Sequence, residues 1–150
     1  MNIINKFIFT ILLLGFVACN TGPKEIDFNS DTCDFCTMSI VDRPYGTELV
    51  TEKGKIYKFD STECMLNYMQ ENSEQTYSHI MTCTMDNPGV LTDAQSAYYL
   101  VSPNLPSPMG ANITAFSTRE LAETSRNENE GEVYDFEGIK SVPIRHNTGH

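Results

Sequence analysis

The chain has 150 residues, of which 40% are hydrophobic, and 20 acidic against 10 basic side chains give a formal net charge of −10 at pH 7. This length suffices for one compact domain, or for two very small units that share a core. Such an acidic surface repels nucleic acid and anionic lipid and favours cationic or metal partners, although solubility alone is a sufficient explanation of the net charge.

An apolar run, "FIFTILLLGFVA", occupies residues 7–18 behind Lys6. It is too short to span a bilayer, which takes about 20 residues, so it is typical of an export signal over residues 1–18. "FVAC" resembles the lipobox of bacterial lipoproteins, although Phe16 stands where that pattern prefers Leu, and the resemblance implies a lipid on Cys19. We expect a lipid anchor in the cell envelope, in the inner or outer membrane, facing the periplasm, with residues 19–31 as a polar tether.

The first half of the domain, expected at residues 32–76, combines strand signals with one helix. Asp60 followed three residues later by Glu63 predicts a reciprocal cap at the start of a helix over 61–71. The runs that predict strands lie at residues 37–41, 47–52 and 55–59.

The second half, expected at residues 77–138, repeats this order. Ser117 and Glu120 again have the spacing of a reciprocal cap, which predicts a helix over 118–126. Strands are predicted at residues 96–101, 112–116 and 131–136.

Each half is therefore approximately β-β-α-β. Neither half has enough residues to bury a core alone, so we expect the two to pack together. The connections are too short for a parallel sheet, which predicts an α+β fold with antiparallel strands. Residues 139–150 are predicted to be a loose tail.

Four cysteines remain beside Cys19, and outside the cytoplasm they would suggest disulfides with three possible pairings. A redox dithiol is one interpretation of the first two, Cys33 and Cys36, but no helix is predicted to begin at Cys36. A zinc site is another: Cys64 and either Cys83 or His79 could complete it. The segment around Cys64 resembles the second half of a treble-clef module, with Asp60 where a cysteine is usual.

A Cu(I) site is the third interpretation of "CDFCTM", residues 33–38, and it best accounts for the methionine. Thiolate and thioether donors together select Cu(I), which does not demand four ligands. On an extended backbone Cys36 and Met38 project to one side. His79, Met81, Cys83 and Met85 alternate in the same way, but ordinary core packing explains them better.

Residues 33–69 and 93–122 together resemble the NosL family of copper-binding lipoproteins, which deliver copper for the maturation of nitrous oxide reductase. The resemblance covers about residues 30–138 and implies a pair of β-β-α-β halves. It also implies a Cu(I) site at Cys36 and Met38, with Met109 of "SPMG" matching another family methionine. Cys33 departs from the family pattern and is a further candidate donor or the disulfide partner of Cys36.

The resulting expectation is a metallochaperone of denitrification, with no catalytic residues, whose partners are a copper transporter or assembly machinery and nitrous oxide reductase. One alternative is a lipoprotein that sequesters or senses copper. The other is an interaction module held together by structural zinc or disulfides. His146 and His150 lie in the expected tail, where they would make a poor fixed site.

Overall fold

The computed structural model describes residues 22–144. The expected export signal, Cys19, His146 and His150 lie outside these residues. Within the described range no helix is both long enough and apolar enough to cross a membrane.

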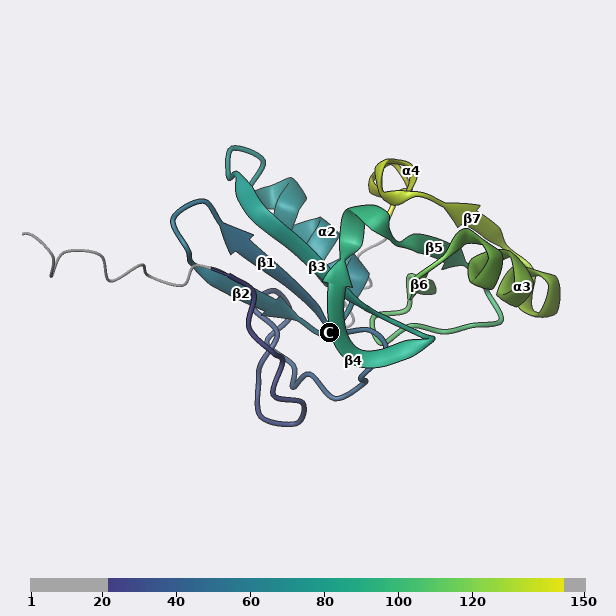
Figure 1. Cartoon of the computed structure of the whole chain (residues 1–150), viewed down its shortest axis with the longest axis horizontal. Coiled ribbons are helices and arrows are strands. Elements are labelled where there is room, and N and C mark those ends of the chain that lie inside the picture. The colour runs from purple at the N-terminus through teal and green to yellow at the C-terminus, as the bar shows by residue number, and fades with distance from the viewer. Residues whose placement is uncertain (1–21, 145–150) are drawn as a thin grey trace, which may run out of the picture.

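An antiparallel sheet with the order β2-β1-β3-β4 forms the first half of the domain (Figure 1). Helix α2 connects β2 to β3 and packs against β1 and β2. The elements are β1 (Thr47–Thr51), β2 (Ile56–Phe59), α2 (Thr62–Glu71), β3 (Tyr77–Thr84) and β4 (Asn87–Asp93).

A smaller antiparallel sheet with the order β6-β5-β7 forms the second half, and α3 packs against all three of its strands. A short 3₁₀ turn, η1 (Ala94–Ser96), connects the halves, and α4 packs on this turn and on β5. The elements are β5 (Tyr98–Val101), β6 (Ile113–Phe116), α3 (Arg119–Asn129), β7 (Glu132–Tyr134) and α4 (Phe136–Lys140).

The predicted α+β fold of two packed β-β-α-β halves is confirmed. The order is β1-β2-α2-β3 in the first half and β5-β6-α3-β7 in the second. One hydrophobic core spans both halves, because α2 and β3 each contact β6. Buried Leu49, Phe59 and Met65 from the first half join Tyr99 and Ile113 from the second.

Strand β3 was not among the predicted strands, and it lies beyond the expected boundary of the first half at residue 76. Strand β4 extends this half further, to Asp93. Its sequence, "NPGVLTD", gave no strand signal because Pro88 and Gly89 usually interrupt strands. The sheet order explains why they are tolerated here, since β4 pairs only with β3 and lies at the edge.

The predicted strand at residues 37–41 is wrong. Only an isolated bridge between Thr32 and Ser39 forms there. Thr37 adopts a left-handed conformation with φ +64°, which breaks the extended backbone between Cys36 and Met38.

Both helices exist, but both predicted caps are displaced by one residue. Ser61 caps α2 by accepting the Cys64 N–H, and Thr118 caps α3 by accepting the Leu121 N–H. Neither Asp60 nor Ser117 is the cap. The reciprocal bond expected from Glu63 is also not formed, because this carboxylate accepts the Ser107 hydroxyl instead.

The packed domain is longer than residues 32–138. Ile26 and Phe28, placed in the expected tether, are buried in the core. Ile139 is fully buried in α4, although the tail was expected to begin there. The N-terminal segment lies below β2 in Figure 1, where the Lys58 ammonium binds the Glu25 carbonyl at 2.8 Å.

Candidate metal centre

Three cysteines and one aspartate converge beside the start of α2. The sulfur atoms of Cys33, Cys36 and Cys64 and a carboxylate oxygen of Asp60 all lie within 4.8 Å of one another. Cys33 and Cys64 are almost completely buried, at 0% and 1% exposure, whereas Cys36 is only partly buried. All three are free thiols. The cluster therefore combines a closed interior with one accessible sulfur at its edge.

A tight turn places Cys33 and Cys36 together. The Thr37 N–H donates to the Cys33 carbonyl at 3.0 Å, and the Cys36 N–H points at the Cys33 sulfur at 3.5 Å. The positive φ of Thr37 completes this turn and returns the chain, so that the Cys33 N–H bonds to the Met38 carbonyl at 2.8 Å. This backbone is that of a metal knuckle, in which both side chains face one centre.

The displaced cap of α2 supplies the other two donors. Because Ser61 performs the capping, the Asp60 carboxylate is released from the helix backbone and accepts a hydrogen bond from the Cys36 thiol at 3.5 Å. Cys64 lies in the first turn of the helix, where its N–H is held by Ser61 at 3.3 Å. Sequence reasoning considered Cys64 for zinc but left it and Asp60 out of the copper site.

The three thiols differ strongly in acidity. A hydrogen bond from Cys64 lowers the pKa of Cys33 to about 7 against the effect of burial, and backbone N–H groups of Cys36, Asp60 and Phe35 add to the lowering. The same contact with Cys33, together with burial, raises the pKa of Cys64. Burial raises the pKa of Cys36 to about 12. In the metal-free protein Cys33 is thus the sulfur that gives up its proton first.

The sequence disfavours the redox interpretation because no helix is predicted to begin at Cys36 and no cation lies near enough in the sequence to stabilise a thiolate. The structure supplies stabilising groups for Cys33 instead, first the Cys64 thiol and then backbone N–H donors of nearby Phe35 and Cys36 and of distant Asp60. Hydrogen bonds to the charged form lower a thiol pKa as a nearby cation would. The sequence could not reveal these contacts in full, because Cys64 and Asp60 lie far from Cys33 along the chain.

Met38 and Met109, the two predicted thioether donors, occupy different environments. Met38 lies at the surface and is 56% exposed. Met109 is partly buried and packs against the main core, as does Cys36. The structure therefore places the Met38 thioether where an incoming partner can reach it.

The loop that carries Met109 is attached to the start of α2. The Ser107 hydroxyl donates to the buried Glu63 carboxylate, which is the neighbour of Cys64 in the helix. Ser107 also accepts the Asn112 N–H at 2.8 Å and so closes the loop on itself. These bonds fix the Met109 loop relative to the cysteine cluster.

The other sulfur-bearing and imidazole side chains of the first sheet lie outside the cluster. Cys83 is fully buried in the core, and burial raises its pKa to about 11. His79 is exposed on the same strand, where its Nδ1 lies 3.1 Å from the neighbouring Ser78 hydroxyl. His79, Met81, Cys83 and Met85 thus differ in burial, from an exposed His79 to a fully buried Cys83.

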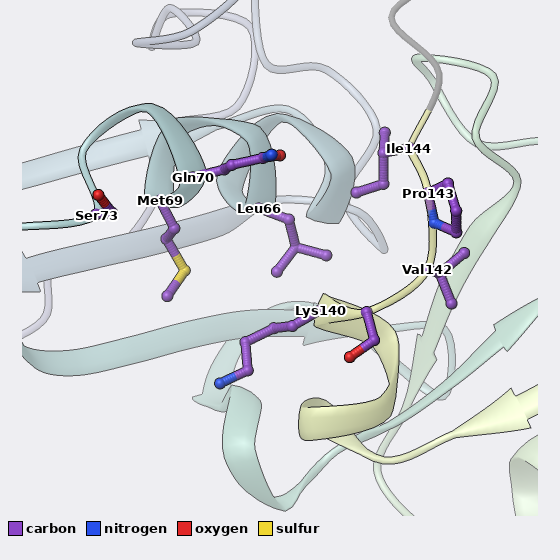
Figure 2. Close-up of a pocket in the computed structure, with 9 residues that line it drawn as sticks. Leu66, Met69, Gln70, Ser73, Lys140, Val142, Pro143 and Ile144 are labelled. Atoms are coloured by element: carbon purple, nitrogen blue, oxygen red, sulfur yellow. The ribbon is translucent and has the colours of Figure 1, made fainter.

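A separate pocket of about 680 Å³ lies between α2 and the chain that leaves α4 (Figure 2). Leu66 and Met69 of α2 face Val142 and Ile144 across it, with Lys140 at its edge. Its lining contains no cysteine and no acidic side chain, so the pocket is not part of the metal centre.

The chain is similar to known proteins in both sequence and structure. The NosL family pattern matches residues 23–143. The copper-binding lipoprotein NosL of Stutzerimonas stutzeri is 33% identical over 151 aligned positions, which cover 89% of this chain and 80% of that protein. The crystal structure of the copper chaperone NosL from Shewanella denitrificans superposes with a TM-score of 0.71 at 22% identity, covering 82% of this chain and 98% of the other, and shows the same fold.

Proposed function

The chain belongs to the NosL family, and from that premise we propose that it is a lipoprotein that binds Cu(I) and delivers it for the maturation of nitrous oxide reductase. The relative from Stutzerimonas stutzeri is named a copper-binding lipoprotein, and the structural neighbour is named a copper chaperone. Neither name describes an enzyme, which supports a role in binding and transfer. The lipid would be carried by Cys19 and hold the domain at a membrane of the cell envelope, facing the periplasm.

One observation carries the proposal: a partly buried thiol at Cys36 is followed two residues later by an exposed thioether at Met38. Both are soft donors that prefer Cu(I) to hard divalent ions. The third donor would be Met109, whose loop is fixed beside α2, or Cys33, whose sulfur lies within 4.8 Å of the Cys36 sulfur. Cu(I) accepts such low coordination.

The exposure of Met38 supports the transfer of copper to a partner in addition to its storage. A partner's thiol or thioether can approach the metal from the Met38 side before Cys36 releases it, so copper would pass by stepwise ligand exchange. Copper must displace the proton of Cys36, whose pKa is raised to about 12 by burial. The affinity for Cu(I) should therefore fall as the pH falls.

A titration of the reduced protein with Cu(I) against a competing chelator tests the site. Cys36→Ser should abolish tight binding, and Met38→Leu should weaken it while preserving the fold, because Leu keeps the volume of Met. Cys83→Ser, which removes a buried thiol outside the cluster, serves as the matched control. If Cys83→Ser proves the most damaging of the three, the copper site lies elsewhere.

Delivery is separated from sequestration or sensing by a transfer experiment. The copper-loaded protein should pass its metal to copper-free nitrous oxide reductase, or to a copper transporter of the same cell, faster than free chelated copper does. Transfer that is no faster than from the chelator complex would favour the sequestering lipoprotein.

A further inference from the structure

The buried part of the cysteine cluster has the dimensions of a tetrahedral metal site. In a zinc site with Zn–S bonds of about 2.3 Å, neighbouring donors are about 3.5–3.8 Å apart. The four donor atoms of Cys33, Cys36, Asp60 and Cys64 lie within 4.8 Å of one another, so only a small contraction would close them around an ion. No large backbone movement is required.

The backbone around these donors already has the form that a bound metal needs. The knuckle of Cys33 and Cys36 is fixed by the bond from the Thr37 N–H to the Cys33 carbonyl at 3.0 Å. Cys64 comes from the first turn of α2, which is held in place by its Ser61 cap. A knuckle combined with a donor from a helix start is also the arrangement of treble-clef modules, to which the sequence around Cys64 is similar.

Asp60 supplies an independent observation that points to a cation. Its side chain is buried, with 4% of the residue exposed, and it forms no ion pair within residues 22–144. Its side-chain partners are all neutral: the Cys36 thiol at 3.5 Å, the Ser61 hydroxyl at 3.4 Å and the Cys64 thiol. A buried carboxylate without a cation is costly, and a divalent ion among the thiols would neutralise it.

We propose that Cys33, Cys36, Cys64 and Asp60 form a tetrahedral site for Zn²⁺. The carboxylate distinguishes this site from the copper site, because Cu(I) prefers soft donors whereas zinc accepts sulfur and oxygen together. A closed set of four protein donors is typical of structural zinc, and this one would fasten residues 33–36 to the start of α2. The proposal does not rest on the proposed copper function, although both sites use the Cys36 sulfur.

Sharing of Cys36 has a direct consequence. Zinc in the buried site and copper at Cys36 and Met38 compete for one thiolate, so binding of Cu(I) should release zinc. The buried donors Cys64 and Asp60 serve zinc alone, whereas the exposed Met38 serves copper alone. Single substitutions can therefore separate the two metals.

The test is a titration of the reduced, metal-free protein with Zn²⁺ against a chromophoric chelator, followed by substitution with Co²⁺. The wild type should bind one equivalent, and the cobalt form should show the intense visible bands and thiolate-to-metal charge transfer of a tetrahedral site with three sulfurs. Cys64→Ser and Asp60→Asn should each weaken zinc binding by about 100-fold, because a site of four donors loses one. Cys83→Ser is the matched control, and circular dichroism of the metal-free variants shows whether each one folds.

The two proposals can fail separately. Binding of Cu(I) without tight binding of Zn²⁺ overturns the zinc site and leaves the copper function standing. Zinc binding that is unaffected by both Cys64→Ser and Asp60→Asn also overturns it, since the ion must then lie elsewhere. Zinc that depends on these residues and that Cu(I) cannot displace supports the zinc site and contradicts the copper function.

Discussion

Removal of the Ser107 hydroxyl should destabilise the domain far more than removal of an exposed serine hydroxyl. In Ser107→Ala the buried Glu63 carboxylate loses its hydroxyl donor, and the Asn112 N–H loses its acceptor at 2.8 Å. A hydrogen bond to a charged group contributes about 1.5–3 kcal/mol and a neutral one about 0.5–1.5 kcal/mol. We therefore expect the free energy of unfolding to fall by about 2–4 kcal/mol.

Urea unfolding followed by far-ultraviolet circular dichroism, with a chelator present, measures this change. Ser96→Ala is the matched control, because the Ser96 hydroxyl also donates to a carboxylate, that of Asp93 at 3.2 Å, but does so at the surface. That bond should contribute less than about 1 kcal/mol. Equal losses in the two variants would refute the conclusion that Ser107 anchors the Met109 loop through a buried contact.

Two further predictions concern the buried acid Glu48 and the glycine Gly131, which has a positive φ. Burial raises the pKa of Glu48 above its ordinary value of 4.5, so the native state holds this proton more tightly than the unfolded chain does, and the free energy of unfolding should decline as the pH rises above 4.5. Glu48→Gln should reduce that slope in urea unfolding from pH 5 to 8, and an unchanged slope would exclude Glu48 as its source. Gly131→Ala should lower the free energy of unfolding more than Gly110→Ala in the same assay. Both residues have positive φ, but a Cβ at Gly131 would lie 2.2 Å from the Val101 carbonyl oxygen, whereas a Cβ at Gly110 would have no atom within 4 Å. Equal costs would show that the backbone conformation alone sets the penalty.

The sequence was sufficient for the fold because the signals that define it are local. Alternating apolar residues and turn residues predicted five of the seven described strands, all except β3 and β4, and the two similar helix starts revealed the repeat. The sequence did not predict strand β4 because Pro88 and Gly89 are compatible with a strand only at a sheet edge, and the position of a strand at the edge depends on the order of the strands. Local patterns do not contain that order.

The candidate metal centre was less accessible to sequence reasoning for two physical reasons. Thr37 adopts a positive φ that a β-branched residue rarely takes, so an extended strand was the reasonable expectation for Cys36 and Met38. Asp60 and Cys64 reach the knuckle over 24 or more residues, and only the folded chain brings them together. Their order in the sequence did suggest a zinc module, but Asp60 stands where such modules usually have a cysteine, which made the expected fourth ligand a poor one.

The sign of the change in the free energy of unfolding of Ser61→Ala identifies the residue that caps α2. If Ser61 is the cap, Ser61→Ala leaves the buried Cys64 N–H without its acceptor at 3.3 Å and should lower the free energy of unfolding by about 0.5–2 kcal/mol. If Asp60 were the cap, Ser61 would be the first helical residue, and Ala, the better helix former, should stabilise the domain by a few tenths of a kcal/mol, roughly. Urea unfolding of the metal-free protein distinguishes these outcomes. If the variant is more stable than the wild type, Asp60 is the cap of α2. Its carboxylate then binds the helix backbone and is not free to bind a metal beside Cys36.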